Sequence, residues 1–373
     1  MSNGNNNTMD RRDFIKKSAM AVAGVAAASL LSSSVVRALN RHVESKTQNN
    51  MKTIFDKTAM RNLNLKNRII RSATWGALAD ANGHFGEEIY RIYDELAAGG
   101  VGCIINEFTS VYDDDYPHEG MARLSNDGLI PDHKRLTDTV HAHHVPVIVQ
   151  LAMDDYQGMR IDELTSDDIS AIRGLFTKAA DRAVLAGYDG VQIHAAHGFF
   201  LSRFISPAHN HQTSTPETFI IDIAKVIRAN HPDLHISMKI NCSDFVYGGL
   251  DENGSLRVCR ACAEFLDSIE VSGNGTSVSG IKAGVNEAYF KRFALALAEK
   301  VDVPVILVGG HRSIDNMNAV LNEGRIEYLS MSRPVVCEPD LINRWESGDT
   351  SPSKCVSCNM CYSTPRHRCV FNL

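Results

Sequence analysis

The sequence has little that would suit a membrane or a nucleic acid. No apolar run reaches the roughly 20 residues that a helix needs to cross a bilayer. Basic residues are not in excess, because the formal net charge is −6 and no stripe of Lys and Arg is present. Binding to phosphate backbones needs clustered cations. The sequence therefore predicts no nucleic-acid partner and no stable membrane span.

Two missing motifs narrow the kind of site. No strand-like run is followed by G-x-G-x-x-G, the fingerprint of a dinucleotide-binding doubly wound sheet. No H-E-x-x-H sequence is present, so a common zinc arrangement is also missing. What remains is a chain with 44% hydrophobic and 22% charged residues. This is the composition of a soluble globular protein.

Residues 1–38 have the layout of an export signal. A polar start leads to the charged RRDFIKK, then to a short run of small apolar residues and a cleavage site at Val36-Arg37-Ala38. Arg11-Arg12, with Phe14 behind them, resemble the twin-arginine motif. The sequence therefore predicts export to the periplasm by the twin-arginine translocase, a route for proteins that fold around a cofactor first. Residues 39–50 are then a linker. The alternative is an amphipathic helix, buried or frayed.

Between residues 51 and 350, short apolar runs alternate with amphipathic helical segments. The strand-like runs are residues 67–72, 102–107, 145–151, 190–194, 235–240, 268–272, 303–310 and 327–332. Their lack of polar alternation is typical of parallel strands buried on both faces, and the segments between them have a helical period. Eight strands alternating with helices predict a single-domain α/β fold, the (β/α)₈ TIM barrel, with a doubly wound sheet as the rival.

In such a barrel, the chemistry lies at the C-terminal ends of the strands. This rule selects Ser72-Ala73-Thr74, Glu107, Gln150, His194 with His197, Lys239, Gly309-Gly310 and Ser332-Arg333. The last two pairs follow the seventh and eighth strands, where barrels commonly bind phosphate. Glycine lets backbone N–H groups approach a phosphate, and arginine adds a charge. These pairs predict a phosphorylated cofactor.

His194 and His197 end the fourth strand. A zinc site needs a third protein ligand in a recognisable relation to the pair, and His-Ala-Ala-His lacks one. Two imidazoles beside Lys239 are better interpreted as hydrogen-bond donors to an electron-rich oxygen. The alternative is a pair of core histidines with satisfied hydrogen bonds.

Several segments, in this order, resemble the Old Yellow Enzyme family of FMN-dependent oxidoreductases. They are LKNRIIRSAT (65–74), YDELAAGGVGCIINEFTSV (93–111), GYDGVQIHAAHGFFLSRFISP (187–207), VPVILVGG (303–310) and SRPVVCEPDLINRW (332–345). The resemblance implies FMN at the top of the barrel. It places Ser72, Ala73 and Thr74 on the N5 side of the flavin, Gln150 at the pyrimidine ring, Lys239 near N1 and the C2 carbonyl, and Gly309, Gly310, Ser332 and Arg333 around the ribityl phosphate. His194 and His197 match the pair that holds a substrate carbonyl or phenolate oxygen.

Phe199 departs from this pattern. The family commonly has a tyrosine two places after the second clamp residue, where it gives a proton to the α-carbon of the substrate. Phenylalanine has no hydroxyl and cannot act as a general acid. Tyr112, Tyr156, Tyr247 or water are the candidate replacements. The segments AMDDYQGMR and HQTSTPETF also differ from the family at the substrate mouth, so the identity of the substrate cannot be transferred.

Residues 351–373 form a cysteine-rich tail with Cys355, Cys358, Cys361 and Cys369 at C-x₂-C-x₂-C-x₇-C spacing. This spacing suits a metal or an iron–sulfur cluster. It resembles the Cys-x-x-Cys-Asn start of the cluster motif in the dienoyl-CoA reductase branch of the family, although the third cysteine comes one residue early. Disulfides or free thiols are the alternative for an exported chain. The remaining cysteines, Cys103, Cys242, Cys259, Cys262 and Cys337, are expected in the core.

The resemblance thus implies an FMN-dependent oxidoreductase that transfers hydride between flavin N5 and a small carbonyl-bearing or electron-poor unsaturated molecule. The expected electron donor is NAD(P)H or a redox protein. Export would favour a donor other than a nicotinamide, because nicotinamide cofactors are scarce outside the cytoplasm. The alternatives are a catalytically altered flavin- or ligand-binding barrel, and another phosphate-binding barrel, such as a lyase or aldolase, which would not be yellow.

Overall fold

The computed structural model describes residues 51–115, 117–275 and 277–373. Residues 52–373 form one compact unit. The predicted export signal and linker lie outside the described residues. None of the helices in the described part of the chain combines the length and the apolar character needed to cross a bilayer.

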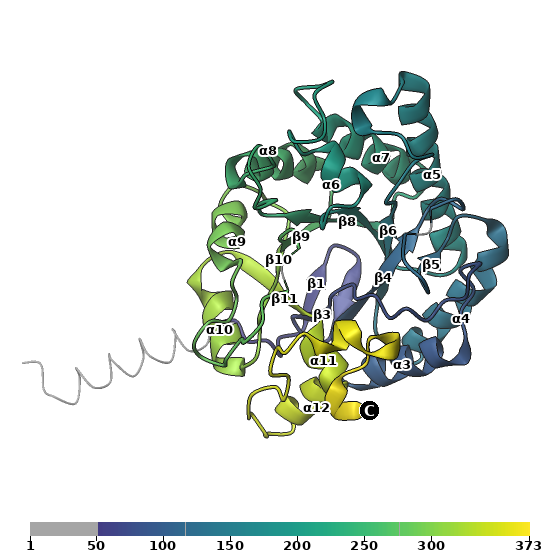
Figure 1. Ribbon diagram of the computed structural model, residues 1–373. Coiled ribbons are helices and arrows are strands. Elements are labelled where there is room, and N and C mark those ends of the chain that lie inside the picture. Colours follow the sequence, from purple (N-terminus) through teal and green to yellow (C-terminus); the bar gives the residue numbers. More distant parts are fainter. Residues whose placement is uncertain (1–50, 116, 276) are drawn as a thin grey trace, which may run out of the picture. The chain divides into compact units, whose positions relative to one another are not determined.

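Eight parallel strands within the described residues close into a barrel (Figure 1). In chain order they are β3 (Ile69–Arg71), β4 (Cys103–Ser110), β6 (Val147–Ala152), β7 (Gly190–Ala195), β8 (His235–Asn241), β9 (Ser268–Ser272), β10 (Val305–Val308) and β11 (Ile326–Met331). Each strand pairs with the next, and β3 pairs with both β11 and β4, which closes the ring. A short strand, β5 (Ala122–Arg123), adds to β4. The predicted (β/α)₈ TIM barrel is confirmed.

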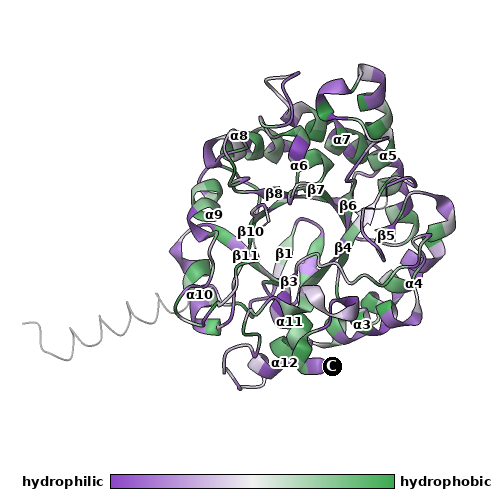
Figure 2. Cartoon of the chain, viewed as in Figure 1, coloured by the Kyte–Doolittle hydropathy of each residue, from purple (hydrophilic) through white to green (hydrophobic). Residues whose placement is uncertain are grey.

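Helices surround the strands and alternate with them (Figure 1). The longer helices are α3 (Glu87–Ala98), α4 (Ile130–His141), α5 (Ser166–Leu185), α7 (Glu217–Asn230), α8 (Glu252–Cys262), α9 (Lys291–Ala298) and α10 (Ile314–Glu323). The shorter ones are α6 (Phe200–Phe204), α11 (Arg333–Cys337) and α12 (Leu341–Glu346), with 3₁₀ turns at Asp127–Leu129, Ile161–Glu163, Ala263–Phe265, Met360–Ser363, Pro365–His367 and Val370–Asn372. Figure 2 shows hydrophobic and hydrophilic residues together on these helices, as expected when one face is buried and the other is solvated.

Local sequence sets several helix ends. Thr165 and Asp168 exchange hydrogen bonds in a capping box at the start of α5. Gly187 follows the end of α5 with φ 85°, in the left-handed region that favours glycine. Gly324 follows α10, but its φ is −167°. A Cβ at Gly324 would come within 2.8 Å of the Leu295 side chain, so this glycine packs closely against Leu295 and does not form a left-handed turn.

The interior of the barrel is apolar at one end and polar at the other. The hairpin of β1 (Thr58–Met60) and β2 (Leu63–Leu65) packs against the first residues of the barrel strands and fills the N-terminal end with apolar side chains. Further along the strands, Gln192, Lys239 and Glu270 are fully or almost fully buried. Charged groups are costly to bury unless they are paired, so this polar layer marks the end of the barrel where a site is expected.

Candidate functional site

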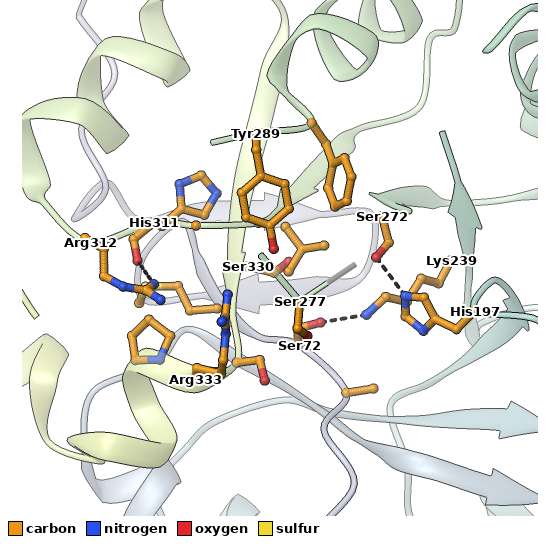
Figure 3. Close-up of a pocket in the computed structure, with 18 of the residues that line it drawn as sticks. Ser72, His197, Lys239, Ser272, Ser277, Tyr289, His311, Arg312, Ser330 and Arg333 are labelled. Carbon is orange, nitrogen blue, oxygen red and sulfur yellow. Dashed lines mark hydrogen bonds between the residues drawn. The ribbon is translucent and has the colours of Figure 1, made fainter. Parts of the chain in front are cut away.

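The barrel-top cavity is a hollow of about 600 Å³ lined by the C-terminal ends of the barrel strands (Figure 3). Most of the predicted site residues line it, namely Ser72, Ala73, His197, Lys239, Gly309, Gly310, Ser332 and Arg333. The chain therefore brings together side chains that are up to 261 positions apart in the sequence (Ser72 to Arg333).

Arg312 and Arg333 lie on one side of this cavity (Figure 3). Arg333 donates hydrogen bonds to the carbonyl of Val278, at 2.9 Å, and to Asn359. Arg312 donates to the carbonyl of Cys355 at 3.1 Å. Neither arginine forms an ion pair with a carboxylate of the described residues, so both charges remain available to an anionic group such as a phosphate. Arg312 was not predicted from the sequence.

Gly309 and Gly310 follow β10 and also line the cavity. Their φ angles are 120° and 84°, a conformation that side chains other than glycine rarely adopt. A Cβ at either position would come within 2.9 Å of the Tyr289 ring. Glycine at both positions therefore allows the backbone of the cavity wall to pass close to the Tyr289 ring.

Lys239 lies on the other side of the cavity (Figure 3). Its Nζ donates a hydrogen bond to Ser72 Oγ at 2.8 Å and forms an ion pair with Glu270 at 3.4 Å. Burial lowers the pKa of Lys239, while the carboxylate of Glu270 acts against this shift. Glu270 lies inside the predicted sixth strand. The sequence of that strand alone does not show that the side chain of Glu270 meets Lys239.

His194 and His197 lie side by side, with ring centroids 5.3 Å apart. His197 Nε2 is 2.8 Å from Ser272 Oγ. His194 is 1% exposed, yet neither of its ring nitrogens has a hydrogen-bond partner in the described part of the chain. His197 lines the barrel-top cavity, and His194 lies next to both His197 and Phe199.

Both imidazoles are neutral near pH 7. Burial lowers the pKa of His197 to about 3, with Lys239 adding to the shift and Glu270 opposing it. Burial, followed by the neighbouring His197 ring and the charge of Lys239, also holds the pKa of His194 well below its usual value. A neutral imidazole carries one N–H donor and one acceptor nitrogen, so each ring can donate to an oxygen.

Phe199 belongs to a chain of aromatic rings beside the histidine pair. Its ring centroid is 4.7 Å from that of His194, 5.0 Å from Phe108 and 6.2 Å from His118. The ring of Trp75 lies 4.9 Å from His118 and continues the chain. His118 was missed by the sequence reasoning, because it lies in a long connection after β4 that has no periodic pattern.

The tyrosines predicted as alternative proton donors are placed differently. Tyr112 and Tyr156 pack against each other, with ring centroids 5.5 Å apart, and the hydroxyl of Tyr112 donates to Asp114 at 3.0 Å. Tyr247 is fully exposed on the loop after β8. The ring of His118, by contrast, lies 6.2 Å from that of Phe199.

Thr74 and Gln150 do not line the barrel-top cavity. Thr74 Oγ1 donates a hydrogen bond to Ser332 Oγ at 2.7 Å. Gln150 Nε2 donates to Gln192 Oε1, also at 2.7 Å, within the buried polar layer. Both residues lie at the predicted strand ends, but their contact with a cofactor stays a prediction.

Glu107 lies in a neighbouring cavity of about 740 Å³ formed by the β3 and β4 ends, α3, α11 and the C-terminal tail. Its Oε2 accepts a hydrogen bond from the Gly76 amide at 2.7 Å. None of the described residues pairs with Oε1. Burial raises the pKa of Glu107 to about 7, against the Gly76 hydrogen bond and the charge of Arg71.

The tail cysteines, Cys355, Cys358, Cys361 and Cys369, line one small cavity together with Arg333 and Asn359. All the cysteines of the described residues are free thiols, and Cys103, Cys242, Cys259, Cys262 and Cys337 are buried, as predicted for core positions. No group of three His, Cys, Asp or Glu side chains in the described ranges is arranged to hold a metal ion. The four cysteines are thus gathered at one place, and their metal or cluster remains a prediction.

The barrel-top cavity fits FMN. The glycine turn with Arg312 and Arg333 suits a phosphate, and Lys239 on the opposite side suits an electron-rich ring edge (Figure 3). An unpaired buried polar group costs about 1–3 kcal/mol. The ring nitrogens of His194, without partners among the described residues, are therefore suited to a bound ligand that supplies the missing hydrogen bonds.

Comparison with known proteins gives the family. Residues 53–160 and 154–351 match the NADH:flavin oxidoreductase / NADH oxidase family. A metal reductase of Desulforamulus reducens is 28% identical over 352 residues, which covers 83% of this chain and 51% of the relative. An NADH oxidase of Thermoanaerobacter brockii is 26% identical over 373 residues, which covers 86% of this chain and 56% of the relative.

Among solved structures, a complex of 2-naphthoyl-CoA reductase with 2-naphthoyl-CoA superposes with a TM-score of 0.76 at 20% identity, over 82% of this chain and 54% of that chain. This likeness supports the barrel fold. The chain spans about half the length of these relatives. Because the family match extends over nearly the whole barrel, the chain belongs to the NADH:flavin oxidoreductase / NADH oxidase family.

Proposed function

We propose that the enzyme transfers hydride between N5 of bound FMN and a small molecule that carries a carbonyl group or an electron-poor double bond. The observation that carries this proposal is the histidine pair at the cavity. His194 is buried and neutral, its ring nitrogens lack partners among the described residues, and it lies beside a second neutral imidazole, His197.

In this proposal, His194 and His197 hold the oxygen of the substrate. Each neutral ring donates one N–H to the carbonyl oxygen and stabilises the negative charge that develops there. The Ser272 hydroxyl, 2.8 Å from His197 Nε2, fixes the orientation of that ring. Because the rings are neutral, they bind an oxygen without giving up a proton to it.

We further propose that His118 gives the proton that the family's tyrosine gives. An imidazole can donate and accept a proton near neutral pH. The ring of His118 lies 6.2 Å from that of Phe199, which holds the place of the tyrosine. His118 is only partly buried, so solvent can reach its ring.

An iron–sulfur cluster at Cys355, Cys358, Cys361 and Cys369 is proposed as a second redox group. The supporting observation is the position of Arg312, which lines the barrel-top cavity and contacts Cys355 Sγ at 3.6 Å. The cysteine cavity is therefore a direct neighbour of the proposed flavin site. A cluster at this position would let a one-electron redox protein serve as the donor in place of NAD(P)H, which suits the proposed export to the periplasm.

The experiment starts with a visible spectrum of the purified protein, where bound flavin gives a yellow colour and an absorbance band. NADH and NADPH are then added separately under nitrogen, and rapid bleaching by either one would count against a dedicated protein donor. A phenol is titrated next, and the change in flavin absorbance is compared with that of a His194→Ala variant of equal flavin content.

We expect the variant to bind the phenol at least about tenfold more weakly, because a substrate hydrogen bond is lost. Equal affinity would contradict the role of the histidine pair. A colourless protein would favour another phosphate-binding barrel. A yellow protein without turnover on any enone or carbonyl acceptor would favour a flavin-binding barrel without catalysis.

A further inference from the structure

A single buried carboxylate lies behind Lys239. Glu270 on β9 is the direct register partner of Lys239 on β8 and is 0% exposed. Its Oε1 accepts hydrogen bonds from Ser72 Oγ and Ser330 Oγ, both at 2.7 Å. Its Oε2 accepts one from Gln192 Nε2 at 2.9 Å and pairs with Lys239 at 3.4 Å. Side chains from three other strands, and from the residue that follows β3, thus converge on this one carboxylate.

These contacts hold Glu270 as an anion. Burial by itself raises the pKa of this carboxyl group, but the charge of Lys239 and the hydrogen bonds from Ser330, Ser72 and Gln192 outweigh burial and leave the pKa below its usual value. In turn, Glu270 counters the effect of burial on the ammonium group of Lys239. The pair therefore carries almost no net charge.

Ser72 connects the pair to the cavity wall. Its hydroxyl accepts a hydrogen bond from Lys239 Nζ at 2.8 Å and donates one to Glu270 Oε1 at 2.7 Å. Lys239 and Ser72 line the barrel-top cavity, whereas Glu270 does not. A ligand in the cavity can thus touch Lys239 and Ser72 but not Glu270, whose charge acts on the ligand only at a distance.

We propose that Glu270 is a positioning residue that sets the reduction potential of the bound flavin by holding the Lys239 ammonium group and offsetting its charge. This inference rests on the proposed placement of the flavin ring at Lys239. Reduced flavin gains negative charge, which an uncompensated ammonium group stabilises. Glu270 fixes the ammonium group in place and offsets its charge, so it limits how strongly the site favours the reduced flavin.

The test is the midpoint potential of the bound flavin in Glu270→Gln, measured by anaerobic titration. The variant keeps the size and one acceptor oxygen of the side chain but removes its charge. We expect the variant to favour reduced over oxidised flavin about tenfold more than the wild type does, which raises the midpoint potential by about 30 mV for a two-electron couple. The titration is run near pH 6 so that Lys239 keeps its proton. Loss of Glu270 favours deprotonation of Lys239, because this lysine is buried and lies near Arg71, His194 and His197.

Ser330→Ala is the matched control, because it removes one hydrogen bond to the same carboxylate without changing the charge. We expect Ser330→Ala to change the preference for reduced over oxidised flavin less than about twofold. Lys239→Met should lower the potential, and the double variant Lys239→Met/Glu270→Gln should move it back toward the wild type. A residue with a merely structural role would not produce this reversal. The pair of Lys239 variants also provides the test if Glu270→Gln does not fold.

The outcomes separate this inference from the proposed function. An unchanged potential in Lys239→Met would overturn the placement of the flavin ring and this inference with it. A lowered potential in Lys239→Met, together with an unchanged or lowered potential in Glu270→Gln, would overturn the inference alone. A raised potential in Glu270→Gln with the reversal in the double variant supports it.

Discussion

Phe199 and His118 decide how a proton can reach the substrate. Phe199 packs between His194 and Phe108, and its ring has no hydroxyl that could donate a proton. The nearest side chain in that ring cluster that can carry a proton, apart from the histidine pair, is His118. The proton donor proposed here therefore comes from a loop, where substitutions are tolerated more easily than in the barrel wall.

The first prediction tests this exchange of donors. His118→Asn should lower product formation from an enone by about 100-fold, the usual contribution of general acid catalysis. Phe199→Tyr restores the hydroxyl and should raise product formation. In the Phe199→Tyr background, the loss caused by His118→Asn should shrink to a few-fold.

The measurement is product formed per bound flavin at saturating reductant, with flavin content checked from the visible spectrum. An equal loss from His118→Asn in both backgrounds would show that the histidine does not replace the tyrosine. No gain in Phe199→Tyr would show that the missing hydroxyl does not limit the reaction.

At the scale of elements, the turn after β10 is the feature most sensitive to a small change. Gly310→Ala adds a Cβ at φ 84°, within 2.9 Å of the Tyr289 ring. We expect at least about tenfold weaker FMN binding, because the added Cβ would displace the turn that is proposed to hold the phosphate; tenfold corresponds to about 1.4 kcal/mol. The measurement is the dissociation constant of FMN from its fluorescence on titration of the apoprotein.

Gly348→Ala is the control for backbone strain alone. Gly348 has a similar φ of 104°, and a Cβ there would meet nothing within 4 Å. It lies after α12 and does not line the cavity. Equal FMN affinity in wild type and Gly310→Ala, or an equal loss in both variants, would speak against a phosphate site at this turn.

The cysteine-rich tail gives the third prediction. If the tail holds an iron–sulfur cluster, anaerobically purified protein contains iron and acid-labile sulfide, and Cys358→Ser loses most of both. Cys262→Ser, which changes a buried cysteine of α8, should retain them. Absence of iron and sulfide in the wild type, with thiols that react or pair as disulfides, would rule out the cluster.

At the scale of the whole molecule, buried histidines couple stability to pH. Burial lowers the pKa of His133, His235 and His311 to about 4 and that of His197 to about 3, and it holds the pKa of His194 well below its usual value. In the unfolded chain, each histidine titrates near pH 6.5. Below that pH the unfolded state binds more protons than the folded state, so the free energy of unfolding falls as the pH falls.

The fourth prediction is therefore a lower thermal midpoint at about pH 5 than at about pH 7. Each histidine contributes up to about 1.4 kcal/mol per pH unit in this window. Glu107 acts in the opposite direction, since its pKa is raised to about 7, and it offsets one of the histidines. His235→Asn should reduce the slope of the unfolding free energy against pH by the contribution of about one proton. A midpoint that is constant or rises toward pH 5 would contradict the neutral state of these side chains.

The fifth prediction concerns export. Changing Arg11 and Arg12 to lysine should keep the protein in the cytoplasm of its host, because the twin-arginine translocase reads the arginine pair. Lys17→Arg is the control, since it alters the same charged segment but leaves the pair intact. The measurement is the amount of protein in periplasmic and cytoplasmic fractions. An equal periplasmic share in both variants would show that another signal or route is used.

The sequence alone determined the barrel, and the reason is that its pattern is local. Each of the eight predicted strands is a short apolar run flanked by helical segments, and a buried parallel strand needs no distant partner to be recognised. The histidine pair, the two glycines and Arg333 were found by the same rule, because strand ends in a barrel all point to one face.

Only the tertiary structure decided which side chains meet. The register between β8 and β9 pairs Lys239 with Glu270, and a shift by one residue would turn Glu270 toward the opposite face of its strand. Gln150 turned toward Gln192 instead of the cavity, and His118 came to Phe199 from a loop without periodicity. Such contacts depend on the packing of distant segments, which periodicity within one segment does not specify.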